Sequence, residues 1–106
     1  MTGWNIHPAA QAEHDGLVRY YAGISAALAV GFEERYLHYR QTIVANPLLY
    51  HLRRGPVRRV NLTPRFGETY IAYMIWREKV VILAVAHAKR RPYYWRRRIA
   101  EAREIF

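Results

Sequence analysis

The chain has 106 residues, of which 17 are lysine or arginine and 8 are aspartate or glutamate, giving a formal net charge of +9. A hydrophobic content of 52% excludes a disordered tail, and the length fits a single domain over residues 1–106. The absence of cysteine excludes disulfides, thiolate metal sites and cysteine nucleophiles.

The positive charge belongs to the second half of the chain. Residues 1–50 hold three cationic against four acidic residues, whereas residues 51–106 hold fourteen against four. Fifteen of the seventeen cations are arginine, which suits bidentate contact with carboxylate or phosphate. A polyanionic partner is therefore expected: nucleic acid, an acidic polypeptide or anionic lipid. The alternative is a solvated cationic surface without a specific partner.

The first half is predicted to be mainly helical. Trp4–Ile6 reads as a short strand, and Pro8 suits the first turn of a helix over residues 9–22. Gly23 supplies a break, and Ser25 caps a second helix whose apolar residues recur at spacings of three and four until Asn46-Pro47. Two helices joined this tightly should form an antiparallel hairpin.

The second half is predicted to be a sheet. LLYHLRRGP, residues 48–56, reads as a loop. A three-stranded antiparallel meander follows, because three segments rich in valine, isoleucine and tyrosine are separated by turn residues. These segments are VRRVNL (57–62), TYIAYMIW (69–76) and KVVILAVAH (79–87). Alternate residues of the middle strand, and likewise Arg58 and Arg59, should point to opposite faces.

The run from Val80 to Arg98, VVILAVAHAKRRPYYWRRR, joins a buried strand directly to a cationic and aromatic segment. Pro92 suits the first turn of a terminal helix, and at least two of Tyr93, Tyr94 and Trp95 should pack that helix on the sheet. The expected fold is α+β: a short N-terminal strand and an antiparallel helix hairpin packed on a three-stranded antiparallel sheet, with a short C-terminal helix.

The N-terminus lacks the pattern of a signal peptide, and no apolar stretch approaches the ~20 residues that span a bilayer. A soluble cytoplasmic protein without a membrane partner is therefore expected. No metal is expected either, because His7, His14, His38 and His51 show no metal-ligand spacing.

The order of these features resembles the RelE/ParE toxin superfamily of bacterial type II toxin–antitoxin modules, over nearly the whole chain. The motifs that carry the resemblance are HPAAQAE, NP after the second helix, VRRVNL, YIAYMI and ILAVAH followed by RRPYYWRRR. The resemblance implies an α+β toxin without a cofactor, which inhibits growth until a labile acidic antitoxin binds it in a hetero-oligomer.

One branch of the superfamily, the RelE-like toxins, cuts messenger RNA on the ribosome without a metal. That reaction needs a proton acceptor, cations for the phosphate and an acid for the leaving group. The resemblance maps these roles onto Arg59, Arg90 and either Tyr93 or Tyr94, with Tyr94 taken in the predicted catalytic set. A different ribonuclease branch uses a histidine near the end of the last strand, where His87 lies, so His87 completes that set. However, Tyr70 and Asn61 stand where this branch has cations, and His87 at a strand end also suits a purely structural role.

The other branch, the ParE-like toxins, poisons DNA gyrase and has no shared catalytic constellation. The histidine, paired arginines, proline, aromatics and terminal arginine cluster resemble this branch more closely, so a gyrase-binding toxin is the favoured prediction. Its antitoxin- or target-binding residues are predicted to be Arg53, Arg54, Arg58, Arg59, Arg90, Arg91, Trp95 and Arg98. The alternatives are a ribosome-dependent mRNA endonuclease and a nucleic-acid-binding module with no toxin role.

Overall fold

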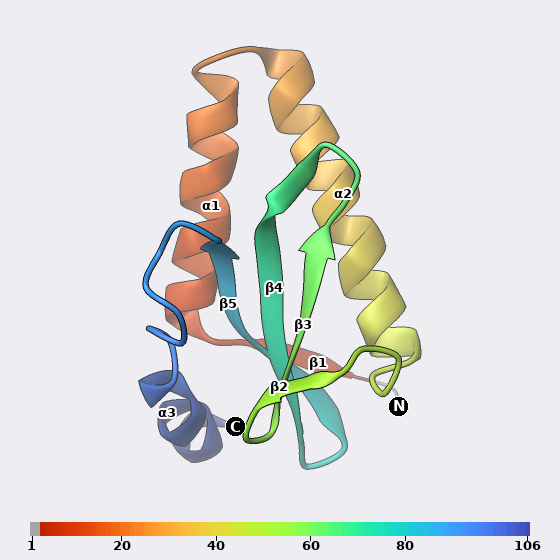
Figure 1. Cartoon of the computed structure of the whole chain (residues 1–106), viewed down its shortest axis with the longest axis vertical. Coiled ribbons are helices and arrows are strands. Elements are labelled where there is room, and N and C mark those ends of the chain that lie inside the picture. The colour runs from red at the N-terminus through yellow and green to blue at the C-terminus, as the bar shows by residue number, and fades with distance from the viewer. Residues whose placement is uncertain (1–2) are drawn as a thin grey trace.

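Two helices make up most of the first half of the protein, which we describe from a computed structural model over residues 3–106. Helix α1 spans Pro8–Ala22 and helix α2 spans Ala26–Ala45; they lie side by side, joined by a short turn (Figure 1). The Ser25 hydroxyl accepts a hydrogen bond from the Leu28 amide at 3.0 Å, so Ser25 caps α2 as predicted.

Five strands form one mixed sheet in the order β1-β5-β4-β3-β2 (Figure 1). Their bounds are β1 Trp4–Ile6, β2 Leu52–Arg54, β3 Val57–Leu62, β4 Phe66–Trp76 and β5 Lys79–His87. Strand β1 pairs parallel to β5, and the other pairs are antiparallel. The predicted α+β class and the short first strand are confirmed, but the sheet is not the predicted three-stranded antiparallel one: those three strands form its centre, and β1 and β2 pair at its edges.

The edge strand β2 was predicted to be loop. All three of its residues are exposed, so it has no buried face that would produce an alternating pattern. It exists because its backbone pairs with β3. Strand β4 also begins three residues earlier than predicted, at Phe66, whose ring packs 5.6 Å from that of Phe32 on α2.

The sheet is covered on both faces. Helices α1 and α2 cover one face, and the segment after β5 packs on the other. The first cluster includes Phe32, Tyr36, Ile43, Ile71 and Tyr73. The second includes Tyr70, Met74, Leu83, Trp95 and Ala102. Alternate residues of β4 thus feed opposite clusters, as predicted.

The C-terminal helix α3 spans Arg97–Ile105, so the prediction that it begins at Pro92 is wrong. Residues 92–96 instead form successive turns, and Tyr93 has a positive φ of 58°. These turns bring Trp95 onto the sheet, where it is only 2% exposed and its Nε1 donates to the Tyr70 hydroxyl at 3.0 Å. The prediction that the aromatic segment docks on the sheet is confirmed, with Tyr93 and Tyr94 packed beside Trp95.

Candidate functional site

The largest polar cluster around the C-terminal segment is centred on Glu13 of α1. Its carboxylate accepts hydrogen bonds from Arg98 at 2.8 and 3.2 Å, from the Val85 amide at 3.2 Å and from the Tyr94 hydroxyl. Arg90 Nη1 lies 3.7 Å away. The side chains of Glu13 and Arg98 are each only 15% exposed. A carboxylate from the N-terminal helix therefore holds Tyr94 and Arg98 of the C-terminal segment by hydrogen bonds, with Arg90 nearby.

Tyr94 is held in its protonated form by this environment. Burial, and then the hydrogen bond and negative charge of Glu13, raise the pKa of Tyr94 well above its usual value. The Arg90 guanidinium lies 4.0 Å from the centre of the Tyr94 ring. The Tyr94 hydroxyl thus already donates a hydrogen bond to the Glu13 carboxylate within the protein.

His87 lies at the end of β5, beside this cluster. Its Nε2 is 3.2 Å from a Glu68 carboxylate oxygen, and its Nδ1 accepts from the Lys89 amide at 3.1 Å. Because Nδ1 accepts the hydrogen bond of the Lys89 amide, Nε2 is the ring nitrogen that faces the Glu68 carboxylate. His87, Arg90, Tyr94 and Glu13 all line one hollow of about 210 Å³.

A second hollow, of about 240 Å³, lies on the sheet face that carries α3. It is lined by Arg53, Arg59, Tyr70, Pro92, Tyr93 and Trp95. The Arg59 guanidinium stacks 3.9 Å above the Tyr70 ring, and its Nε donates to the Asn61 side chain at 3.3 Å. Cationic and aromatic groups together suit a planar or anionic partner.

The structure divides the predicted residues among several places. The predicted ribonuclease set is split, because Arg59 lines the second hollow whereas His87, Arg90 and Tyr94 line the first. Arg58 and Arg59 point to opposite faces, as predicted. Arg58 turns toward the loop between α2 and β2, where its Nη1 donates to the Tyr50 carbonyl at 2.6 Å.

The remaining predicted binding residues lie around the α3 side of the sheet. Arg53 and Arg54 are exposed on β2, and the Arg54 guanidinium lies 4.9 Å from the centre of the Tyr93 ring. Arg91 is exposed beside the arginines that begin α3. Trp95 is buried, so its indole serves packing and is not available to a partner.

Two acidic residues in this region were not predicted as site residues. Glu13 closes the HPAAQAE stretch, and that was the one available signal for it. Glu68 precedes the apolar part of β4 and pairs with His87 only because β4 and β5 are antiparallel, with Thr69 opposite His87. Neither contact can be read from sequence spacing, since each spans the fold.

No protein-family model and no curated protein matches this chain. In residues 3–106, no group of three or more histidine, aspartate or glutamate side chains is placed to hold a metal ion. No helix in the same range is long and apolar enough to cross a membrane.

Proposed function

We propose that this chain is the toxin of a bacterial type II toxin–antitoxin module, from the ParE-like branch of the RelE/ParE superfamily, and that it acts by binding and poisoning DNA gyrase. The sequence motifs support the family, and an α+β fold is what the resemblance implies. The observation that carries the mechanism is the cluster on Glu13. Its carboxylate accepts a hydrogen bond from Tyr94 and lies 3.7 Å from Arg90, so it engages two of the four groups on which RNA cleavage would depend.

The cations that remain available support a binding role. Arg53 and Arg54 project from an exposed edge strand, and Arg59 lies over Tyr70 at the neighbouring hollow. Arginine beside aromatic rings is typical of residues that dominate binding energy at protein interfaces. Such a surface also suits an acidic antitoxin, with which association should be fast and sensitive to salt.

The antitoxin part of the proposal has a direct test. A small acidic protein encoded beside this gene is expected, and its association rate with the toxin should fall between low and physiological salt. Arg53→Gln with Arg54→Gln should slow association, whereas Arg58→Gln should change it less because Arg58 binds the Tyr50 carbonyl. A rate independent of salt would contradict the electrostatic account.

The mechanism is tested by giving the purified toxin two targets in parallel: gyrase with supercoiled DNA, and programmed ribosomes. Gyrase inhibition without transcript cleavage is expected. Because affinity is spread over a surface, Arg59→Gln should weaken inhibition about tenfold, and His87→Ala should change it little. Failure to inhibit gyrase would reject the proposed target.

A second candidate function, ribosome-dependent mRNA cleavage, is favoured by one observation. The His87–Glu68 pair lies in the same region as Arg90 and Tyr94, and a carboxylate can orient a histidine that acts as a base. In that case His87→Ala should lower cleavage about a hundredfold while ribosome binding persists. Codon-specific cleavage with that pattern would replace the gyrase proposal.

A further inference from the structure

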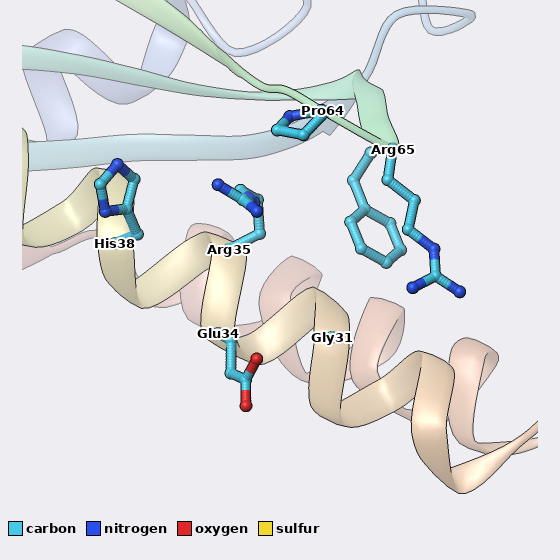
Figure 2. A pocket seen from close by; sticks show the side chains of 7 residues that line it. Gly31, Glu34, Arg35, His38, Pro64 and Arg65 are labelled. Atoms are coloured by element: carbon cyan, nitrogen blue, oxygen red, sulfur yellow. The ribbon is translucent and has the colours of Figure 1, made fainter.

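A third hollow, of about 320 Å³, lies away from both sites described above, between α2 and the turn that joins β3 to β4 (Figure 2). It is lined by Gly31, Glu34, Arg35, His38, Pro64, Arg65 and Phe66. Two elements distant in sequence thus contribute side chains to one concave surface. Neither the toxin proposal nor its alternative uses any of these residues.

The lining is cationic and lacks internal neutralisation. Arg35 and His38 project from α2 toward the strands, and Arg65 enters from the turn, whereas Glu34 points away from them (Figure 2). Within residues 3–106, none of the side chains of Arg35, His38 and Arg65 has a nitrogen within 4.0 Å of a carboxylate oxygen. This differs from the cluster on Glu13, where arginines surround a carboxylate.

The backbone at Arg65 is held in a conformation that favours glycine. Arg65 has a φ of 80°, and the Phe66 amide donates to the Pro64 carbonyl at 3.0 Å, which closes a tight three-residue turn around it. A γ-turn of this hand is rare and strained for a residue with a side chain. The strain therefore points to a use for the arginine that the turn itself does not need.

The turn brings the Arg65 guanidinium close to α2. A Cβ atom added to Gly31 would lie 3.8 Å from Arg65 Nη1 and 3.8 Å from the Phe66 ring. The Phe66 ring centre lies 5.7 Å from the guanidinium carbon, so the side chain has a partner that limits its freedom. Arg65 thus lies against α2 and lines the same hollow as Arg35 and His38.

We propose that Arg35, His38 and Arg65 form a binding site for a phosphate group. Two guanidinium groups offer planar pairs of N–H donors that match phosphate oxygens, and the imidazole adds a third donor. The phosphate belongs either to a small phosphorylated molecule or to the backbone of a nucleic acid. The site is independent of the toxin proposal, because it involves none of the residues assigned to gyrase, antitoxin or ribosome.

The test uses the full chain and two probes: inorganic phosphate, and a short single-stranded oligonucleotide. Binding is followed by NMR of the arginine side-chain N–H groups and by calorimetry. Arg35→Gln and Arg65→Gly should each weaken binding about tenfold or more, since each removes charge-assisted hydrogen bonds. The matched control is Arg19→Gln, which removes the same charge from an exposed helical position on α1 that does not line the hollow.

Arg65→Gly separates binding from folding. Glycine adopts a positive φ without strain, so this variant should keep or raise the melting temperature while it loses phosphate. Loss of affinity for inorganic phosphate in both variants assigns the site to small phosphorylated ligands. Loss for the oligonucleotide alone assigns it to a nucleic acid backbone. No binding of either probe at millimolar concentration, or an equal loss in Arg19→Gln, would overturn the proposal.

Discussion

The two faces of the sheet are held by different kinds of contact. On the α1 and α2 side, large apolar side chains such as Phe32, Ile43 and Ile71 interlock in a continuous cluster. On the α3 side, the sheet contributes three alanines, Ala72, Ala84 and Ala86, beside larger residues, and the buried ring of Trp95 packs on them from the C-terminal segment. The second layer therefore depends on few anchors.

Polar contacts with the N-terminal part of the chain hold α3 and the turns before it in place. Glu13 binds Arg98 and Tyr94, and His7 Nε2 lies 2.8 Å from a Glu101 oxygen of α3. A nine-residue helix is not stable by itself in water, so α3 needs such contacts. Apolar burial supplies most of the stability on one face, whereas directional bonds fix one geometry on the other.

The largest effect is expected from Trp95→Ala, which removes the one large side chain that, among residues 88–106, is buried on the sheet. The variant should lose about 3–5 kcal/mol in free energy of unfolding, measured with urea. Hydrogen exchange should show greater loss of protection in α3 than in α2. Tyr70→Phe is the control, since it removes only the hydroxyl bonded to Trp95 and should cost about 1 kcal/mol. Equal loss of protection in both layers would mean that they unfold as one unit.

Glu13→Gln should give the next largest effect, because Arg98 then remains partly buried without a charged partner. We expect a loss of about 2–3 kcal/mol, below the value for a fully buried pair because both side chains are 15% exposed. Combining it with Arg98→Met should restore part of the loss. Glu104→Gln, on an exposed position of α3, should change stability by less than about 0.5 kcal/mol. Additive losses in the double variant would contradict the coupling.

Stability at alkaline pH should depend on Tyr73, which is buried on the sheet face covered by α1 and α2. Burial raises the pKa of Tyr73 from 10.0 to about 12, and its hydroxyl donates to the Pro47 carbonyl at 2.8 Å. The folded protein favours the protonated phenol, so this stability is complete below about pH 10 and falls as pH rises toward 12. Tyr73→Phe should flatten that decline by on the order of 2 kcal/mol, because it removes the titrating group. Denaturant unfolding between pH 8 and 12 measures this.

If the free energy of unfolding falls with pH equally in the wild type and in Tyr73→Phe, this tyrosine does not govern alkaline unfolding. Tyr94→Phe provides the matched measurement on the other face. The pKa of Tyr94 is raised by burial and then by Glu13, so its removal should also flatten the decline.

The smallest effect is expected at the turn between β4 and β5. Arg77 and Glu78 have φ values of 52° and 65°, so the turn requires two residues that tolerate positive φ. Replacing both, as Arg77→Asn with Glu78→Gly, should raise stability by about 1 kcal/mol. Because β4 and β5 contribute side chains to both hydrophobic clusters, the added stability should increase hydrogen-exchange protection equally on both faces of the sheet. A gain confined to one layer would refute this.

The helices and the three central strands could be predicted because each buries a face, and burial produces a regular pattern in the sequence. The same rule explains the errors. Strand β2 buries no side chain and was missed, whereas Trp4–Ile6 was correctly predicted as a strand and only its parallel place beside β5 was not. Pro92 suited a helix start, but the helix begins only after Trp95 has reached the sheet.

The candidate site was predictable only in part. The arginines after β5 and the buried role of Trp95 followed from local composition. The Glu13 cluster did not, because it joins residues up to 85 positions apart, and long-range pairing leaves no trace in one sequence. The separation of Arg59 from Arg90 is likewise a product of the sheet order and not of spacing.

Strand β2 also bears on whether copies of the protein can pair edge to edge. An unpaired strand at the end of a sheet is a template for pairing with another molecule, and Leu52 offers such an encounter an exposed apolar side chain. Arg53 and Arg54 oppose it, since two copies brought edge to edge would place like charges together, and the irregular register between Leu52 and Arg54 breaks the flat pairing surface. The arginines that would attract a polyanion should thus also oppose the pairing of one copy's sheet with another's.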